Sequence, residues 1–87
     1  MKVNPSFILR EIAGDYMVVA IGNDVVDLSD SFSLSESGAF LWKALEEDTT
    51  EDALVDALLT EYDVDRETAV SDVQDFLESL SERGMLV

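Results

Sequence analysis

The chain has 87 residues, with no cysteine and no histidine, and 20 acidic side chains against five basic ones give a formal net charge of −15. This length gives room for one domain, residues 1–87, with one modest core. The missing residue types remove the commonest general base, thiolate chemistry and the usual zinc ligands, so we expect no catalysis and no metal or cofactor. Duplex DNA is excluded as a partner because its binding draws on cations that neutralise phosphates.

The chain also lacks the marks of a membrane or exported protein. No apolar run approaches the roughly 20 residues that cross a bilayer, and the N-terminus lacks the apolar core of a signal peptide. A hydrophobic fraction of 47% is at the same time too high for a disordered acidic chain. We therefore expect a folded cytoplasmic protein without a membrane partner.

Up to Ser35, apolar residues come in short runs that are typical of strands. The predicted strands are residues 7–12, 16–21 and 31–34, with a further extended run at 25–28. Gly14 suits the first turn, residues 22–24 interrupt the chain as a turn or bulge, and Ser29-Asp30 predicts another turn. In the last strand Phe32 and Leu34 alternate with Ser31 and Ser33, a half-polar pattern that is typical of a sheet edge.

After Ser35, apolar residues recur at helical spacing to the end of the chain. The predicted helices are residues 36–46, 51–62 and 66–83. The expected N-caps of these helices are Ser35 for the first, Thr49 or Thr50 for the second, and Asp65 for the third. Gly84 stands where a left-handed residue ends a helix, and Met85 is placed to pack against Leu80. Trp42 lies on a helix with little polar face, so we expect it in the core.

Strands followed by helices predict a small α+β domain with a winged-helix-like outline, about three antiparallel strands and then three helices. An exposed edge strand at residues 31–34, together with a long last helix, suits a peptide that adds to the sheet as a further strand. Because an open edge can also pair with its own copy, a monomer and a homodimer are both open.

Other functions stay open from the residues alone. Half of the acids lie within residues 46–67, which reads either as a solvated face or as a docking face for a basic partner. An acidic winged-helix interaction module or regulator, binding protein rather than DNA, fits this composition. An acyl carrier would attach its group at Ser31, although Asp30-Ser31-Phe32 has strand-like alternation. A calcium loop from Asp63 lacks the required glycine and glutamate at its sixth and twelfth positions.

Several segments resemble the PqqD family. The segment Leu34-Ser35-Glu36-Ser37-Gly38-Ala39-Phe40-Leu41-Trp42 is similar to the family's Leu-Asn-x-Thr-Ala-x-x-(Leu/Ile)-Trp. Thr50-Glu51-Asp52-Ala53-Leu54 resembles the start of its second helix. Leu77, Leu80, Gly84 and Leu86 match its C-terminal Leu-x-x-Leu-x-x-x-Gly-(Leu)-Leu pattern.

The resemblance implies a RiPP recognition element, a peptide chaperone in which three strands pack against three helices. In that family the leader of a ribosomally made precursor peptide adds to the third strand, in a groove beside the third helix. The chaperone presents the peptide to a modifying enzyme, often a radical S-adenosylmethionine enzyme. Production of pyrroloquinoline quinone (PQQ) itself is not implied, because relatives serve other peptide pathways.

Placed on this chain, the resemblance gives eight candidate peptide-binding residues. We expect the leader to pair with the edge strand and to rest on one flank of the last helix, four positions spaced i, i+4, i+7 and i+11. These residues are Ser31, Phe32, Ser33 and Leu34 on the strand, and Val70, Gln74, Leu77 and Ser81 on the helix.

Overall fold

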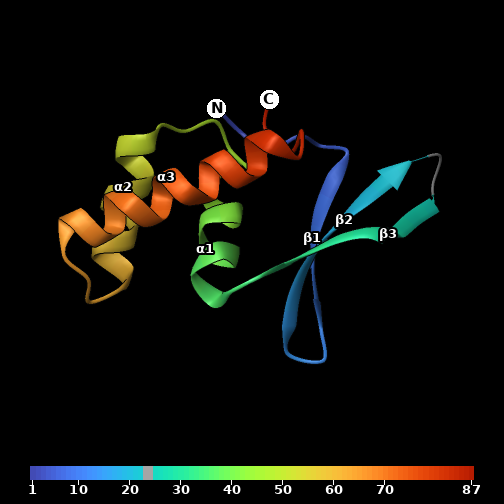
Figure 1. Cartoon of the computed structure of the whole chain (residues 1–87), viewed down its shortest axis with the longest axis horizontal. Helices are drawn as coiled ribbons and strands as arrows, with labels where there is room; N and C mark the ends of the chain where they lie inside the picture. The colour runs from blue at the N-terminus through green and yellow to red at the C-terminus, as the bar shows by residue number, and fades with distance from the viewer. Residues whose placement is uncertain (23–24) are drawn as a thin grey trace.

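The computed structural model describes the backbone of residues 1–22 and 25–87, and the side chains of residues 1–21 and 32–87 (Figure 1). Three antiparallel strands come first and three helices follow, so the predicted α+β fold is confirmed. The likeness to a winged helix is approximate. Figure 1 shows the three helices gathered to one side of the strands.

The sheet has the order β1-β2-β3, with β1 at Phe7–Ile12, β2 at Asp15–Gly22 and β3 at Val25–Leu34. The apolar strand β2 is central, and β1 and β3 form the two edges. Ala13 and Gly14 connect β1 to β2 with φ angles of 54° and 85°. Two positive φ angles in a two-residue connection are the mark of a tight hairpin whose twist matches that of the strands.

The predicted turn at Ser29-Asp30 is wrong, because β3 continues through both residues. The strand accommodates them in a register shift. Between the pairs Val18–Phe32 and Ala20–Asp27, β2 advances by two residues and β3 by five. Such an irregularity bends a strand without ending it. A turn or bulge is also predicted at residues 22–24. Gly22 is the last residue of β2, and residues 23–24 lie outside the described residues.

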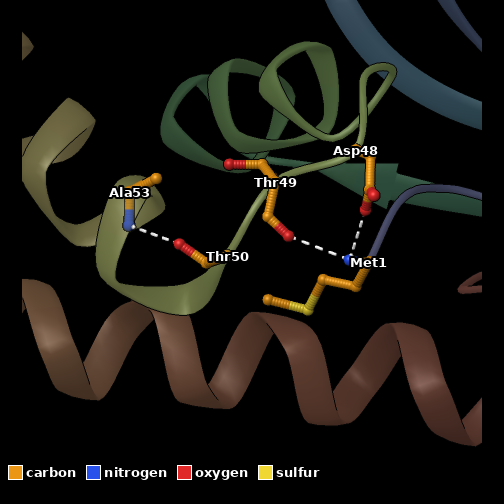
Figure 2. Close-up of polar contacts among 5 residues, drawn as sticks. All are labelled: Met1, Asp48, Thr49, Thr50 and Ala53. Carbon is orange, nitrogen blue, oxygen red and sulfur yellow. Dashed lines mark hydrogen bonds and ion pairs between the residues drawn. The ribbon is translucent and has the colours of Figure 1, made fainter.

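The helices are α1 at Glu36–Ala44, α2 at Glu51–Glu61 and α3 at Arg66–Glu82. Each predicted N-cap is confirmed by a side-chain oxygen that accepts a backbone N–H three residues on. The distances are 3.1 Å for Ser35, 3.2 Å for Thr50, which is drawn in Figure 2, and 2.7 Å for Asp65. These bonds satisfy donors that the first turn of a helix leaves free.

The predicted end of α3 is also confirmed. Gly84 has a φ of 70°, its N–H donates to the Ser81 carbonyl at 3.1 Å, and the Met85 N–H donates to the Leu80 carbonyl at 2.9 Å. This pair of bonds is the Schellman closure. It turns the chain back so that Met85 is buried in the same core as Leu80.

The core lies between the sheet and the helices. Trp42 is 1% exposed, as predicted, and packs in one cluster with Val18 of the sheet and with buried residues of all three helices. The N-terminal segment closes the core from another side, since Val3 bridges Leu86 and donates its N–H to the Leu45 carbonyl at 2.8 Å. Over the described residues, no helix is long and apolar enough to span a bilayer.

Figure 2 shows how the N-terminal segment is held to the connection between α1 and α2. The amine of Met1 donates to the Asp48 carboxylate at 2.6 Å and to the Thr49 carbonyl at 2.9 Å. The amine lowers the pKa of Asp48, first through this hydrogen bond and then through its charge. The ends of the chain are therefore tied to the helical layer, and β1 and β3 are left as the edges of the sheet.

Candidate functional site

The backbone of Ser33 faces away from the sheet. The Ile21 N–H donates to the Ser6 carbonyl at 2.7 Å, which shows that the odd-numbered residues of β2 direct their backbone groups toward β1. Successive residues of an antiparallel strand point to alternate sides, so Tyr16 and Val18 face β3. Their partners on β3, Leu34 and Phe32, therefore bond to β2.

Ser33 lies between those two bonded positions, opposite Met17. Its N–H and C=O consequently point out from the free edge of β3. The serine side chain is exposed, whereas Phe32 and Leu34 are half-buried against the core. This short stretch thus offers one donor and one acceptor to an incoming strand, with apolar side chains on the side of the helices.

The C-terminal end of α3 meets β3 at Phe32. The guanidinium carbon of Arg83 lies 4.1 Å from the centre of the Phe32 ring, a cation–π contact between residues that are 51 positions apart. This contact places the C-terminal end of α3 beside Phe32. Since successive helical residues are about 100° apart, Ser79 and Phe76 lie on the same flank as Arg83.

Where β3 runs into α1, the surface is hollowed. A cavity of about 290 Å³ is lined by the start of α1, by Leu58 of α2, and by the Phe76 and Ser79 flank of α3. A second hollow of about 350 Å³ shares Ser35, Ser37, Leu58 and Asp72 with the first and extends toward Tyr62. We use the name β3–α3 groove for the candidate peptide surface, which comprises Phe32, Ser33 and Leu34 of β3, the Arg83 side chain over Phe32, and Phe76 and Ser79 of the first hollow.

The groove has a charge at each end. Arg83 stands at the Phe32 end, whereas Glu36, Asp72 and Asp75 line the hollows at the α1 end. Burial raises the pKa of Tyr62, which packs edge-on against Phe40 with 5.7 Å between ring centres, and the nearby Glu36 and Glu61 carboxylates raise it further. Tyr62 therefore offers a neutral phenol to the second hollow.

The strand half of the predicted site lies at the free edge of β3, where Ser33 is exposed and Phe32 and Leu34 are half-buried against the core. Its role in peptide binding stays a prediction. Ser31 lies within β3, and that position does not fit the helix start at which an acyl carrier bears its group. Its side chain lies outside the described residues.

The four predicted helix residues do share one face of α3, but on the other side of its buried stripe from Arg83. Val70 and Leu77 are half-buried against the core, and Gln74 and Ser81 are exposed. The role of this face in binding stays a prediction. Spacing alone marks Phe76, Ser79 and Arg83 as an equally continuous face, and no signal in the sequence says which face borders the strand.

Over the described residues, no three acidic side chains gather in a way that could hold a metal ion. The groove offers a backbone donor and acceptor at a strand edge, apolar side chains beside them, and charges at both ends. An extended peptide that adds to a sheet edge needs these features.

Comparisons with known proteins agree with this geometry. The family model described as "Coenzyme PQQ synthesis protein D (PqqD)" matches residues 15–86. No curated protein matches the sequence.

Two solved structures share the fold. TbiB1 in complex with the TbiA(beta) leader peptide has 29% sequence identity and a TM-score of 0.77, over 99% of this chain and 94% of that one. Lasso peptide synthetase B1 complexed with the leader peptide has 20% identity and a TM-score of 0.75, over 97% of this chain and 93% of that one.

Proposed function

The chain belongs to the PqqD family, and on that premise we propose that it is a peptide chaperone that binds the leader of a ribosomally synthesised precursor. It then presents the precursor to a modifying enzyme and carries out no chemistry itself. The observation that carries this proposal is the outward N–H and C=O of Ser33 at the open edge of β3, beside the groove.

The solved relative at 29% identity supports the same function. Its structure contains a leader peptide, and the similarity covers nearly the whole of both chains. A leader strand on β3 would bond to Ser33 and direct alternate side chains toward the helices. These side chains would meet Leu34 and the half-buried ring of Phe76.

Two flanks of α3 compete as the helical wall of the peptide site. We favour the flank of Phe76, Ser79 and Arg83, because Arg83 lies over Phe32 of the strand that would pair with the leader. The flank of Val70, Gln74, Leu77 and Ser81 remains the second candidate.

The partner in this proposal is a modifying enzyme of the same peptide pathway, with a radical S-adenosylmethionine enzyme as the specific candidate. A cytoplasmic location goes with the proposal, because the precursor is made on ribosomes. The product of the pathway is made from the modified precursor peptide, and PQQ is one product of this kind.

An amide chemical-shift titration with the leader of a precursor encoded beside this chain tests the proposal. We expect shifts at Phe32, Ser33 and Leu34. The variant Ser33→Pro removes the outward N–H, and we expect it to weaken binding by about 1–3 kcal/mol. Ser33→Val is the matched control, because it keeps the N–H and changes only an exposed side chain.

Both variants are first checked for an intact fold by the dispersion of their amide spectra. Equal leader affinities for Ser33→Pro and Ser33→Val would show that the β3 edge does not bond the peptide. Chemical-shift changes confined to α2, with no change in β3, would point instead to a protein-interaction module that uses the acidic surface.

A further inference from the structure

A larger hollow lies at the opposite edge of the sheet. Its volume is about 480 Å³, and its walls are the N-terminal segment, β1 and the end of α1. Val3, Leu9 and Trp42 give it an apolar floor, while Lys2 and Arg10 stand on its rim. None of these residues belongs to the β3–α3 groove.

The backbone along this hollow is open to a further strand. Arg10 pairs with Met17, whose backbone groups face β1, so Arg10 bonds to β2 and the alternate residues Leu9 and Glu11 face outward. The Phe7 N–H is already taken by the Asn4 carbonyl at 3.0 Å. Leu9 and Glu11 thus offer two donors and two acceptors at the free edge of β1.

Two of the five basic residues of the chain stand at this edge. Of the five basic residues, Arg66 pairs with Asp56 at 3.2 Å, Lys43 lies 5.7 Å from the centre of the Tyr16 ring, and Arg83 lies over Phe32. The remaining two, Lys2 and Arg10, both line this hollow. Over the residues that the structure describes, neither has a carboxylate within ion-pair distance. The pKa of Asp48, which the Met1 amine lowers, is nevertheless lowered further by the charge of Lys2, and two acids share this edge, Glu46 in the lining and Glu11 on β1.

We propose that the β1 edge is a second docking site, which receives an extended segment of the modifying enzyme with alternating acidic and apolar side chains. Leu9 packs toward the core, Arg10 alternates with it along β1, and both line the hollow. An added strand would therefore place apolar side chains in the hollow and acidic side chains beside Arg10. That the partner is the modifying enzyme rests on the proposed function. That the edge binds a strand with acidic and apolar side chains rests only on the hollow and on Lys2 and Arg10.

The two docking sites lie on opposite edges of a three-stranded sheet, with β2 between them. A leader on β3 and an enzyme segment on β1 can therefore be bound at the same time. This arrangement lets one small domain hold both partners of the modification reaction.

A blocked eight-residue peptide in which glutamates alternate with valines and leucines is the probe for the edge. Its matched control carries lysine in place of each glutamate. The overall charge of −15 attracts the basic peptide. We nevertheless expect the acidic peptide to shift the amides of Leu9 and Glu11 and the Trp42 indole, with about tenfold higher affinity at this edge.

The variant Arg10→Glu should abolish this preference, whereas Lys43→Glu makes the same change in charge elsewhere and should preserve it. Equal affinity for the two peptides at β1, or shifts of β3 alone, would overturn the proposal. If the amide chemical shifts of β1 changed when the protein was concentrated without any peptide, the edge would bind a second copy of the chain. That result would also overturn the proposal.

The assembly test uses the modifying enzyme encoded beside this chain. Arg10→Glu should weaken binding of that enzyme about tenfold and leave leader affinity unchanged, whereas Ser33→Pro should do the reverse. An enzyme affinity that Arg10→Glu leaves unchanged would overturn the assignment of the partner. Loss of leader binding with the β1 site intact would contradict the proposed function alone.

Discussion

At the scale of single residues, Gly38 of α1 lies close to the end of β3 and to α3. A Cβ built on it would lie 3.4 Å from the Leu34 Cβ, 3.4 Å from the Ser35 Oγ and 3.5 Å from the Phe76 ring. These are ordinary van der Waals distances, so the position accepts one methyl group and little more. The PqqD-like motif has alanine here, and the geometry agrees with that choice.

We predict that Gly38→Ala stabilises the protein by about 0.5–1 kcal/mol, because alanine costs less conformational entropy in a helix and its methyl fits the space. Gly84→Ala is the contrasting change, since a φ of 70° strains any L side chain there, and it should destabilise by about 1 kcal/mol. Urea unfolding of both variants measures the two effects. A destabilised Gly38→Ala would mean that α1, β3 and α3 are packed too tightly for a methyl group.

Among residues, the sequence was informative about caps and poor about distant pairs. Ser35, Thr50 and Asp65 were identified because a cap depends on neighbours three positions away. The contact between Arg83 and Phe32 depends on how α3 crosses the sheet, which no local pattern encodes. The helical wall of the candidate site was therefore assigned to a flank by spacing alone.

At the scale of elements, the start of α3 should respond to pH. The Thr68 hydroxyl, and then its backbone N–H, hydrogen-bond the Asp65 carboxylate and lower its pKa. A pKa that is lower in the folded state stabilises the fold above the unfolded-state pKa of about 3.9, and this contribution is lost as the pH falls through the folded value.

We predict that Thr68→Val raises the pKa of Asp65 toward its ordinary value, as followed by the carboxyl carbon shift in an NMR titration. The variant Asp65→Asn keeps a good cap without a titrating group. Its free energy of unfolding should therefore vary less than that of the wild type between pH 5 and pH 3. A wild-type and an Asp65→Asn protein with parallel pH profiles would show that the cap charge has no influence on stability.

The two flanks of α3 can be compared directly. We predict that Ser79→Tyr fills the hollow at the start of α1 and weakens leader binding about tenfold, or about 1.4 kcal/mol, whereas Gln74→Tyr on the other flank leaves it unchanged. Isothermal titration with the same leader measures both affinities. The opposite result would assign the peptide to the flank of Val70 and Gln74.

The strands show where propensity is overruled. Ser29 and Asp30 are turn formers, yet β3 continues through them because pairing with β2 resumes on both sides of the register shift. The half-polar alternation before Ser35 did predict the edge position of β3, because an edge strand has one side in water. Which backbone groups face outward depends on the register, and the register is a property of the folded sheet.

At the scale of the whole molecule, charge repulsion opposes the compact state. Ten acidic residues lie within residues 46–67. Over the described residues there are two ion pairs, Met1 with Asp48 and Arg66 with Asp56, and both lie at the surface. We predict a melting temperature that rises from low salt to about 0.15 M salt, where screening acts over roughly 8 Å. Calorimetric scans in a salt series measure it, and a flat series would mean that the acids are too far apart to interact.

The register shift between β2 and β3 also limits the length of strand edge on which further copies of the chain could pair. Fibril growth needs a long, straight strand edge on which further copies can stack in register. The shift falls between Val18 and Ala20, so the straight part of the β3 ladder is confined to the few residues around Ser33. A short peptide can use so brief a template, whereas a long stack of strands needs more, and we therefore expect the open edge of β3 not to seed aggregates.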